Sequence, residues 1–450
     1  MAFLASKARR HGAGPLVLAG ALPLLFLHKH YQPSLSAGGI DVTLSDVAAA
    51  AVVIAAGLAG ARRGFGPLRR TRTVWIALAL FIGWAFVSLA WARHNDPAYG
   101  IGSHLVSAGK FLEYALLAPA VPLLLRSEDE RRTLFVALAA WSSFLTAVAL
   151  LQFLGVVSEF EGRRPLQREP SYVGVHELGA LSGAALSLAL VAIVVGRWRR
   201  YSAVAAIAGG LGVALAAALD SVGGVVAAAA TVWVVTQKRA HVPIRRVLAL
   251  VAVVLAIGGA AVSLRSTAVT AFLQFLGVRS AQTEARGHVQ TYAHRTLLGY
   301  IGVKIWLDHP VVGAGWQESL QPAAFTPHLA AAHRKFPSEP KEAFPSPQHE
   351  WGIQNGIVQA LADLGVIGLG LLLAVLGAAF RLALHAGLRR PATNADAALT
   401  ALAWLWVSFA VVTGTGLLAG TAADTLLWLA VGLAAAVAAE PLHESLTPRR

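Results

Sequence analysis

The sequence contains no cysteine and few charged residues. Without cysteine, its 450 residues can form no disulfide, no thiolate metal site and no cysteine nucleophile. Charged residues make up 13% of the chain, against about 25% in ordinary soluble domains, whereas 56% of the residues are hydrophobic. A soluble core cannot bury that much apolar surface, so the composition predicts a membrane protein.

Basic residues outnumber acidic ones, with 37 Lys and Arg against 23 Asp and Glu. They occur in short clusters between apolar runs, which is typical of membrane topology, so we expect no nucleic-acid partner. The first apolar run follows Lys7, Arg9 and Arg10 and has no small-residue cleavage site. We expect it to be a retained spanning helix.

Apolar segments close to the ~20 residues of a spanning helix recur along the chain. They lie at 12–28, 45–61, 74–92, 104–125, 133–155, 178–195, 202–219, 221–236, 247–263, 355–380, 398–417 and 421–439. We therefore expect an all-α polytopic membrane protein with about 12 transmembrane helices and one large extracytoplasmic loop containing amphipathic helices. The expected domains are a bundle (1–263), this loop (264–354), three further spans (355–439) and a cytoplasmic tail (440–450).

The distribution of basic residues predicts the orientation. With the N-terminus inside, 23 of the 37 Lys and Arg residues fall in cytoplasmic segments and five in the short external connections. The long interval 264–354 holds eight, but long domains are translocated largely regardless of charge. Both termini are therefore expected in the cytoplasm, with the long loop outside.

Four charged residues in or near the spans need an explanation. Lys110 and Glu113 are three residues apart on one helix face and are expected to pair, either as a structural ion pair or at a substrate site. Asp220 is expected near the outer surface, where a carboxylate stays hydrated. Asp363 lies deeper, as a hydrogen-bonded structural acid or a site residue.

Two external regions carry basic residues. Arg163, Arg164 and Arg168 lie on the outer face, against the positive-inside trend, which indicates either an anionic ligand or snorkelling to lipid headgroups. Residues 288–308 follow helical spacing with an apolar stripe, and Arg295 points away from it. The stripe consists of Leu297, Leu298, Ile301, Ile305 and Trp306. We expect this helix to lie flat on the bundle and to direct Arg295 into a cavity.

His349 stands just before the next span. A histidine at the rim of a bundle suits general-base work on a hydroxyl, although an external histidine can equally have no catalytic role. The histidines of the long loop lack the spacing of a zinc site, so we expect no metal and no cofactor.

Two stretches resemble a known family. The first is His294-Arg295 followed by residues 304–316, which read KIWLDHPVVGAGW; the second runs from Gln354-Asn355 to Gly368. They are similar to the motifs of the O-antigen ligase and polymerase superfamily of bacterial envelope membrane proteins. The resemblance covers most of the chain in architecture, and in motif detail about residues 286–370.

The resemblance implies a GT-C-like membrane glycosyltransferase. Such an enzyme moves a glycan from a polyprenyl-diphosphate carrier to a hydroxyl of a glycan or glycolipid acceptor, with inversion and without a metal. It implies a multi-pass protein of the bacterial cytoplasmic (inner) membrane, in contact with membrane lipids. The active site would lie on the extracytoplasmic face.

The chain departs from the motif at its histidine position, which is occupied by Gln354. Glutamine cannot act as a base, so either His349 takes over or the activity is altered. The expected catalytic residues are His349 and Arg295. The expected diphosphate-binding residues are Arg295, Arg168, Arg164, Arg163 and Arg286, with Gln354, Asn355, His294 and Asp363 in support.

Three alternatives remain open at this stage. A ligase and a polymerase differ in the acceptor, which the sequence does not specify, and neither the glycan nor the oligomeric state can be deduced. A lipid-linked glycan transporter or flippase would also suit a basic cavity among twelve helices, although no repeat relates the two halves. The glutamine at position 354 would suit a non-catalytic scaffold.

Overall fold

The computed structural model describes residues 13–37, 40–238, 241–266, 269–270, 273, 291–337, 339–347, 349, 351–389, 396–417 and 422–440. Its long helices are α2 (Gly14–Phe26), α3 (Leu44–Arg63), α5 (Arg72–Asn95), α6 (Ile101–Ala115), α8 (Glu128–Phe153), α9 (Val175–Val195), α10 (Arg200–Ala216), α11 (Leu219–Gln237), α12 (Ile244–Leu264), α14 (Thr291–Asp308), α15 (Pro322–Lys335), α16 (Gly356–Arg389), α17 (Asp396–Thr415) and α18 (Ala422–Ala439). Shorter elements are α4 (Gly66–Arg70), α7 (Leu117–Leu124), η1 (Lys29–Tyr31), η2 (Glu318–Leu320) and η3 (Lys341–Ala343). Strands β1 (Ser34–Ala37) and β2 (Ile40–Thr43) form an antiparallel hairpin.

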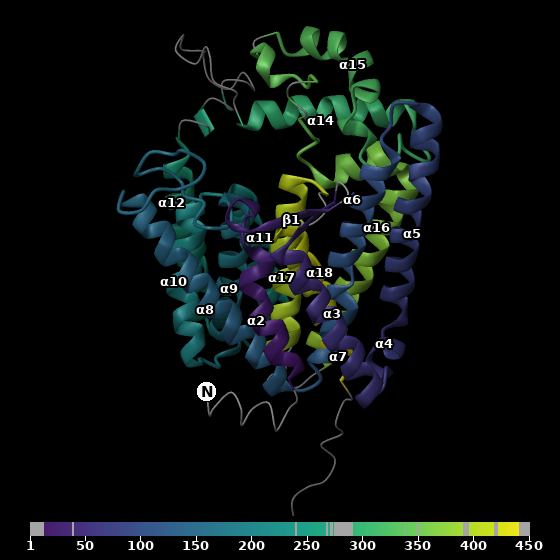
Figure 1. Ribbon diagram of the computed structural model, residues 1–450. Coiled ribbons are helices and arrows are strands. Elements are labelled where there is room, and N and C mark those ends of the chain that lie inside the picture. The colour runs from purple at the N-terminus through teal and green to yellow at the C-terminus, as the bar shows by residue number, and fades with distance from the viewer. Residues whose placement is uncertain are drawn as a thin grey trace, which may run out of the picture.

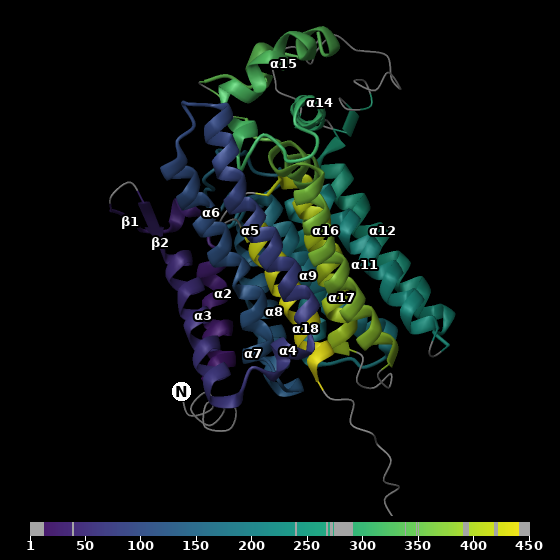
Figure 2. The ribbon, with the colours of Figure 1, turned by 90° about the vertical axis from the view of Figure 1, so that its right-hand side faces the viewer.

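Apart from α14 and α15, the long helices run side by side as a bundle. Helix α14 lies across one end of this bundle (Figures 1 and 2). Helix α15 lies beyond α14, on the side away from the bundle. We refer to these two ends as the α14 end and the opposite end. The predicted flat helix is therefore present, and it covers the end of the bundle.

Eight described helices are long and apolar enough to span a membrane, namely α3, α5, α8, α9, α11, α12, α16 and α17. Three shorter apolar helices accompany them. This composition confirms an all-α polytopic membrane protein, whereas the count of twelve spans stays a prediction. The predicted segment 104–125 is wrong as a single helix, because Leu116 separates α6 from α7, and Pro119 has no N–H to donate to the Ala115 carbonyl across this break.

Helix α2 begins and α18 finishes at the opposite end of the bundle. Gly14 packs against Leu124 at the end of α7, and the Arg70 guanidinium donates to the Ala439 carbonyl at 2.7 Å. Figure 1 shows α4 and α7 at this end. The two ends of the described chain therefore lie on one side of the bundle, as the prediction of an even number of spans requires; which side is cytoplasmic stays a prediction.

Helix α9 lies in the middle of the bundle. In its most apolar window 89% of the residues are buried, whereas the corresponding figure for α12 is 17%. The first turn of α9 carries His176 and Glu177, and both residues are half-buried. His176 lies at the α14 end of α9, since its Nε2 is 2.9 Å from Nη2 of Arg295 on α14.

Helix α16 is kinked where a glycine-rich turn binds to it. Gly365 interrupts the helix with φ 66°, and the backbone groups freed there bond to the turn after α14. The Ala314 N–H donates to the Ala362 carbonyl at 2.8 Å, and the Val366 N–H donates to the Pro310 carbonyl at 3.0 Å. The two stretches that carry the family resemblance are therefore one structural unit.

Both sides of this contact require glycine. A Cβ at Gly365 would lie 2.2 Å from the Val311 carbonyl oxygen, and a Cβ at Gly313 would lie 2.4 Å from the Asp363 backbone. Both glycines also have positive φ, which side chains disfavour. The close approach fixes α14 relative to α16.

The charged pair predicted within the fourth span is wrong. The Lys110 ammonium lies 2.9 Å from a carboxylate oxygen of Asp46 and 2.7 Å from the Asp41 carbonyl, and among the described residues Asp46 is its ion-pair partner. Asp46 also closes a capping box with Thr43 at the start of α3. Lys110 therefore ties α6 to the hairpin and α3.

Candidate active site

The apolar face of α14 is buried against α15 and the start of α16. The predicted stripe is confirmed, because Leu297, Leu298, Ile301 and Ile305 are at most 2% exposed. Trp306 is half-buried, and its indole N–H donates to the Pro310 carbonyl at 3.1 Å. With this face fixed, Arg295 projects toward the first turn of α9 and the segment before α16.

Arg295 belongs to a chain of four hydrogen-bonded side chains. Its Nε donates to the Gln354 amide oxygen at 3.0 Å, and its Nη2 lies 2.9 Å from Nε2 of His176. Nδ1 of His176 in turn lies 2.9 Å from a carboxylate oxygen of Asp220. Because a guanidinium can only donate, His176 Nε2 must accept, and its Nδ1 proton is therefore donated to Asp220. This chain fixes the plane of the Arg295 guanidinium.

Sequence reasoning missed His176 and gave Asp220 the wrong environment. Asp220 was expected in water, but its side chain is 8% exposed and bonded to His176. Close packing also requires a glycine opposite it, since a Cβ at Gly414 would lie 2.5 Å from its carboxylate. One available signal was that His176 and Asp220 each stand at the start of an apolar helix on the same side of the predicted bundle.

Two further arginines lie close to Arg295. Arg265, directly after α12, is 5% exposed, and its guanidinium lies 4.8 Å from the centre of the Tyr292 ring. Arg168, in the connection between α8 and α9, has a buried Nη1 with no hydrogen-bond partner in the described structure. Among the described residues, none of the three arginines has a carboxylate within 4.0 Å. Within the described part of the chain, no direct ion pair therefore neutralises these arginines, and Glu161 and Asp220 act on Arg168 and Arg265 only at longer range.

Burial and the mutual repulsion of these arginines lower the pKa values of Arg168 and Arg265. Burial, together with the charges of Arg163, Arg265 and Arg295, lowers the pKa of Arg168 to about 10. Burial also lowers the pKa of Arg265, with Arg295 and Arg163 contributing. Arginine remains protonated at neutral pH despite such shifts, so the cluster attracts an anion.

A cavity of about 930 Å³ opens beside Arg295. Its lining comes from α14, the end of α15, the start of α16 and the end of α17, and comprises Tyr292, Arg295, Thr296, Gly299, Tyr300, Val303, Lys335, Phe336, Gln354, Asn355, Val358, Thr413 and Gly414. Ligand sites commonly have volumes of roughly 300–1,000 Å³. The cavity is therefore large enough for a phosphorylated sugar, with two basic side chains on its wall.

The remaining predicted diphosphate ligands differ in position. Arg163 already pairs with Glu161 on its own loop. Arg164 is exposed on that loop. Arg286 lies outside the described residues. Arg168 is the residue of this loop whose pKa is lowered by the charge of Arg295.

The supporting residues have distinct roles. Gln354 holds Arg295, as described above. The Asn355 side chain caps α16 by accepting from the Ile357 and Val358 N–H groups at 3.1 and 3.0 Å, and it also lines the cavity. Asp363 is 3% exposed and accepts from the Ser319 N–H at 2.9 Å. It is therefore a hydrogen-bonded structural acid that holds the chain after the glycine-rich turn.

The two histidines proposed from sequence pack around Trp351. The His349 ring stacks on Trp351 with centroids 6.1 Å apart, and the His294 ring meets Trp351 edge-on at 4.9 Å. His349 is exposed, whereas burial lowers the pKa of His294 and favours its neutral form. Among the contacts of the described residues none joins His349 to Arg295, so a catalytic role for His349 stays a prediction.

Fold and site together define a multi-pass helical membrane protein with a cationic cavity at one end of the bundle. Residues 221–373, about a third of the chain, match the family model described as O-antigen ligase. This match confirms the predicted resemblance to the O-antigen ligase and polymerase superfamily and supports a membrane enzyme that acts on lipid-linked glycans. No curated protein matches the chain. The matched range contains Arg265, Arg295 and Gln354 but not His176.

Proposed function

We propose that this protein transfers a glycan from a polyprenyl-diphosphate carrier to an acceptor hydroxyl during assembly of a bacterial envelope polysaccharide. The reaction takes place at the α14 end of the bundle, which faces the extracytoplasmic side of the cytoplasmic membrane in the topology predicted from basic residues. The proposal includes both a ligase, with a glycolipid acceptor, and a polymerase, with a glycan acceptor.

One observation carries this proposal. Arg168, Arg265 and Arg295 are gathered at one end of the bundle without a carboxylate partner within 4.0 Å in the described structure. Burying cations without partners is costly, and a bound dianionic group removes that cost. Arginine's planar fork matches the oxygens of a diphosphate, which makes that group the best-fitting ligand.

The arrangement also suits the chemistry of transfer. The acceptor oxygen attacks the anomeric carbon from the face opposite the diphosphate, and the bond from that carbon to the diphosphate oxygen breaks with inversion. Negative charge grows on the departing diphosphate, where fixed guanidinium groups stabilise it. The step as proposed requires neither a metal nor a cofactor.

The acceptor proton requires a separate group. His349, on the proline-rich segment before α16, is the proposed base, since its exposed imidazole is free to meet an acceptor that arrives from outside. His176 has a different task, because its Nε2 already accepts a hydrogen bond from Arg295. We assign it to positioning the guanidinium.

The test uses the full chain reconstituted in liposomes with a polyprenyl-diphosphate glycan and candidate acceptors. Release of free carrier diphosphate is measured for the wild type, Arg295→Ala and His349→Ala. Arg334→Ala is the matched control, since Arg334 is exposed on α15 at the same end. We expect Arg295→Ala to lose about 10²–10³-fold in rate, as for removal of one transition-state donor, while the control retains activity.

Different outcomes would revise different parts of the proposal. Undiminished release in Arg295→Ala would overturn the assignment of the site. Movement of the lipid-linked glycan across the bilayer without transfer would favour a transporter. Transfer only to a glycolipid, or only to a second lipid-linked glycan, distinguishes a ligase from a polymerase.

A further inference from the structure

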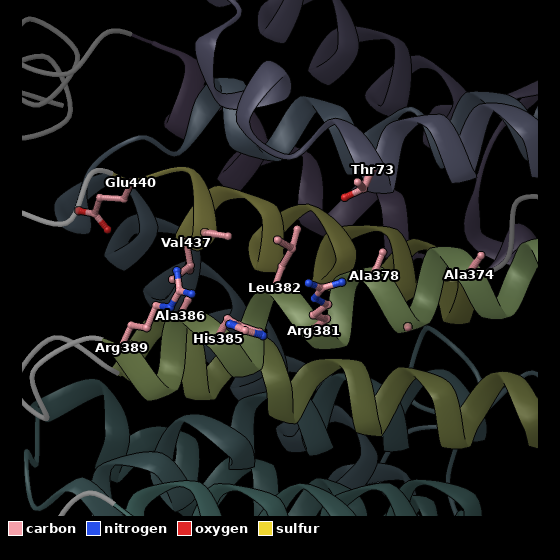
Figure 3. A pocket seen from close by; sticks show the side chains of 12 residues that line it. Thr73, Ala374, Ala378, Arg381, Leu382, His385, Ala386, Arg389, Val437 and Glu440 are labelled. Carbon is pink, nitrogen blue, oxygen red and sulfur yellow. The ribbon is translucent and has the colours of Figure 1, made fainter.

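A second cavity, of about 660 Å³, lies at the opposite end of the bundle between α5, α16 and α18 (Figure 3). Its lining comprises Thr73, Ala374, Gly377, Ala378, Arg381, Leu382, His385, Ala386, Arg389, Val437, Ala438 and Glu440. It is separate from the candidate active site, since no residue lines both cavities. The proposed glycan transfer gives it no role.

The basic groups of this cavity lie along one face of α16. Arg381, His385 and Arg389 are four residues apart, which places them on successive turns, and all three are exposed. Figure 3 shows their side chains along the groove between α16 and α18. Among the described residues none of the three has a carboxylate within 4.0 Å, and Glu440 across the groove pairs with Arg131 at 2.9 Å. The groove therefore has a net positive charge.

Toward the α14 end from the basic groups, the same face of α16 carries only glycine and alanine. Gly370, Ala374 and Gly377 form an exposed stripe, and a Cβ added at Gly370 or Gly377 would meet nothing within 4 Å. From Gly370 to Arg381 the helix rises about 16 Å. Within this stretch, Ala374, Gly377 and Ala378 line the cavity itself. This apolar part of the lining, here called the trench, leads into the basic groove, and α16 is long and apolar enough to span a membrane.

We propose that this groove binds one anionic phospholipid from the leaflet at the opposite end. The headgroup phosphate lies between Arg381 and Arg389, and one acyl chain follows the trench past Gly377. Basic pockets between membrane helices are known to favour anionic headgroups. Basic residues at the end of a helix can also simply complement the helix dipole, without binding a ligand. That role does not require the apolar trench beside them.

The test is native mass spectrometry of the full chain released from nanodiscs that contain equal amounts of phosphatidylcholine and phosphatidylglycerol. Retained lipids are counted for the wild type, Arg381→Gln/Arg389→Gln and the control Arg62→Gln/Arg69→Gln. The control removes the same charge from exposed arginines at the same end, outside the groove. We expect the wild type and the control to retain one phosphatidylglycerol molecule and the groove variant to hold it about 30-fold more weakly, since each of the two arginines contributes about fivefold to binding.

A second variant separates a phospholipid from a free anion. Gly377→Leu fills the trench without changing charge, and its added side chain begins in open space. Loss of phosphatidylglycerol in this variant supports the proposal. The proposal would be overturned if phosphatidylcholine were retained equally, or if Arg381→Gln/Arg389→Gln retained phosphatidylglycerol as well as the wild type does. It would also be overturned if inorganic phosphate displaced the lipid from the wild type while Gly377→Leu retained the lipid fully.

Discussion

At the scale of single residues, the proposed activity depends on how one guanidinium is held. Gln354 and His176 occupy Nε and Nη2 of Arg295, and Asp220 fixes the tautomer of His176. Both contacts lie on one edge of the guanidinium, so Nη1 remains for a ligand in the described structure. His176 is thus a positioning residue, and Gln354 has the same role at Nε of Arg295.

Replacing His176 by leucine should misplace Arg295. We expect kcat to fall by about 10–100-fold, because displacements near 1 Å can cost that much in rate. His176→Gln should retain most of the activity, since an amide oxygen can accept from Arg295 in the same way. Rates of carrier release at saturating donor check both expectations.

The control is the substitution His176→Leu made in a protein that already carries Arg295→Ala. In an Arg295→Ala background, His176→Leu should have little further effect, because the two residues act through one contact. If the two losses multiply instead, His176 acts independently of Arg295 and the positioning role is wrong.

The sequence could predict Arg295 and, as a supporting residue, Gln354, but not the contacts of His176 and Asp220. Helical spacing in residues 288–308 assigns the apolar stripe to the bundle and leaves Arg295 on another face, which is local information. His176 and Asp220 reach the site from α9 and α11, so their proximity depends on how distant helices pack. No local period encodes such a contact, and a buried Asp at the start of a helix has the same sequence pattern as a hydrated one.

At the scale of elements, the contact between α14 and α16 determines the geometry of the site. The glycine-rich turn after α14 bonds to the kink in α16, so Arg295 and Gln354 are positioned by the same backbone interface. Sequence motifs indicated both halves of this interface. The kink itself was not predicted, because the freed Leu364 carbonyl is satisfied from α5 by the Trp84 indole N–H at 3.0 Å.

Adding a single methyl group at Gly365 should separate the two elements. Gly365→Ala forces a Cβ to within 2.2 Å of the Val311 carbonyl oxygen and strains a backbone with φ 66°. With ψ −169°, Gly365 lies in a region of positive φ that is almost restricted to glycine, where a side chain costs about 1–3 kcal/mol, and the clash adds to that cost. We expect a clearly lower thermal unfolding temperature in detergent and reduced glycan transfer.

Gly370→Ala is the matched control on the same helix, since its Cβ meets nothing within 4 Å. It should leave the unfolding temperature unchanged or raise it slightly, because alanine favours helix. Equal unfolding temperatures for the two variants would mean that the interface does not determine the stability of α16.

Burial beside Asp96 and Asp363 raises the pKa of Glu318 in η2 to about 8. The folded protein therefore binds a proton that the unfolded chain releases near the ordinary value of 4.5, and stability should fall as pH rises from about 4.5 to 8. Its Oε2 is buried without a hydrogen-bond partner in the described structure, which adds to the cost of ionisation.

Glu318→Gln should remove this dependence. We expect the variant to unfold at a higher temperature than the wild type at pH 9 and at a similar temperature at pH 5. The unfolding temperature of both proteins is measured across a pH series, with Glu342→Gln, at an exposed position, as the control. A wild type whose stability rises between pH 5 and 8 relative to Glu318→Gln would contradict the assignment.

At the scale of the whole molecule, sidedness connects the fold to the function. The structure places the start of α2 and the end of α18 at the opposite end from α14, whereas only the distribution of basic residues predicts which end is cytoplasmic. Composition and periodicity were sufficient for a polytopic helical bundle with a large loop. They misjudged the segment 104–125 because two short helices match one long hydropathic run.

The absence of cysteine makes sidedness directly measurable. Gln167→Cys introduces a thiol in the exposed loop before α9, and Arg69→Cys introduces one at the opposite end. In intact cells a membrane-impermeant maleimide should label Gln167→Cys, while Arg69→Cys should react only after lysis. The reverse pattern would place the candidate site in the cytoplasm and contradict the proposed function.

The central claim is that the arginine cluster binds the diphosphate of a lipid carrier. Its most direct test is the affinity of the purified chain for polyprenyl diphosphate and polyprenyl monophosphate, measured by titration for the wild type and Arg295→Ala. We predict that the wild type prefers the diphosphate and that Arg295→Ala weakens its binding by about 10–100-fold, as expected for loss of hydrogen bonds to a charged group. Equal affinity of the wild type and Arg295→Ala for the diphosphate would contradict the claim.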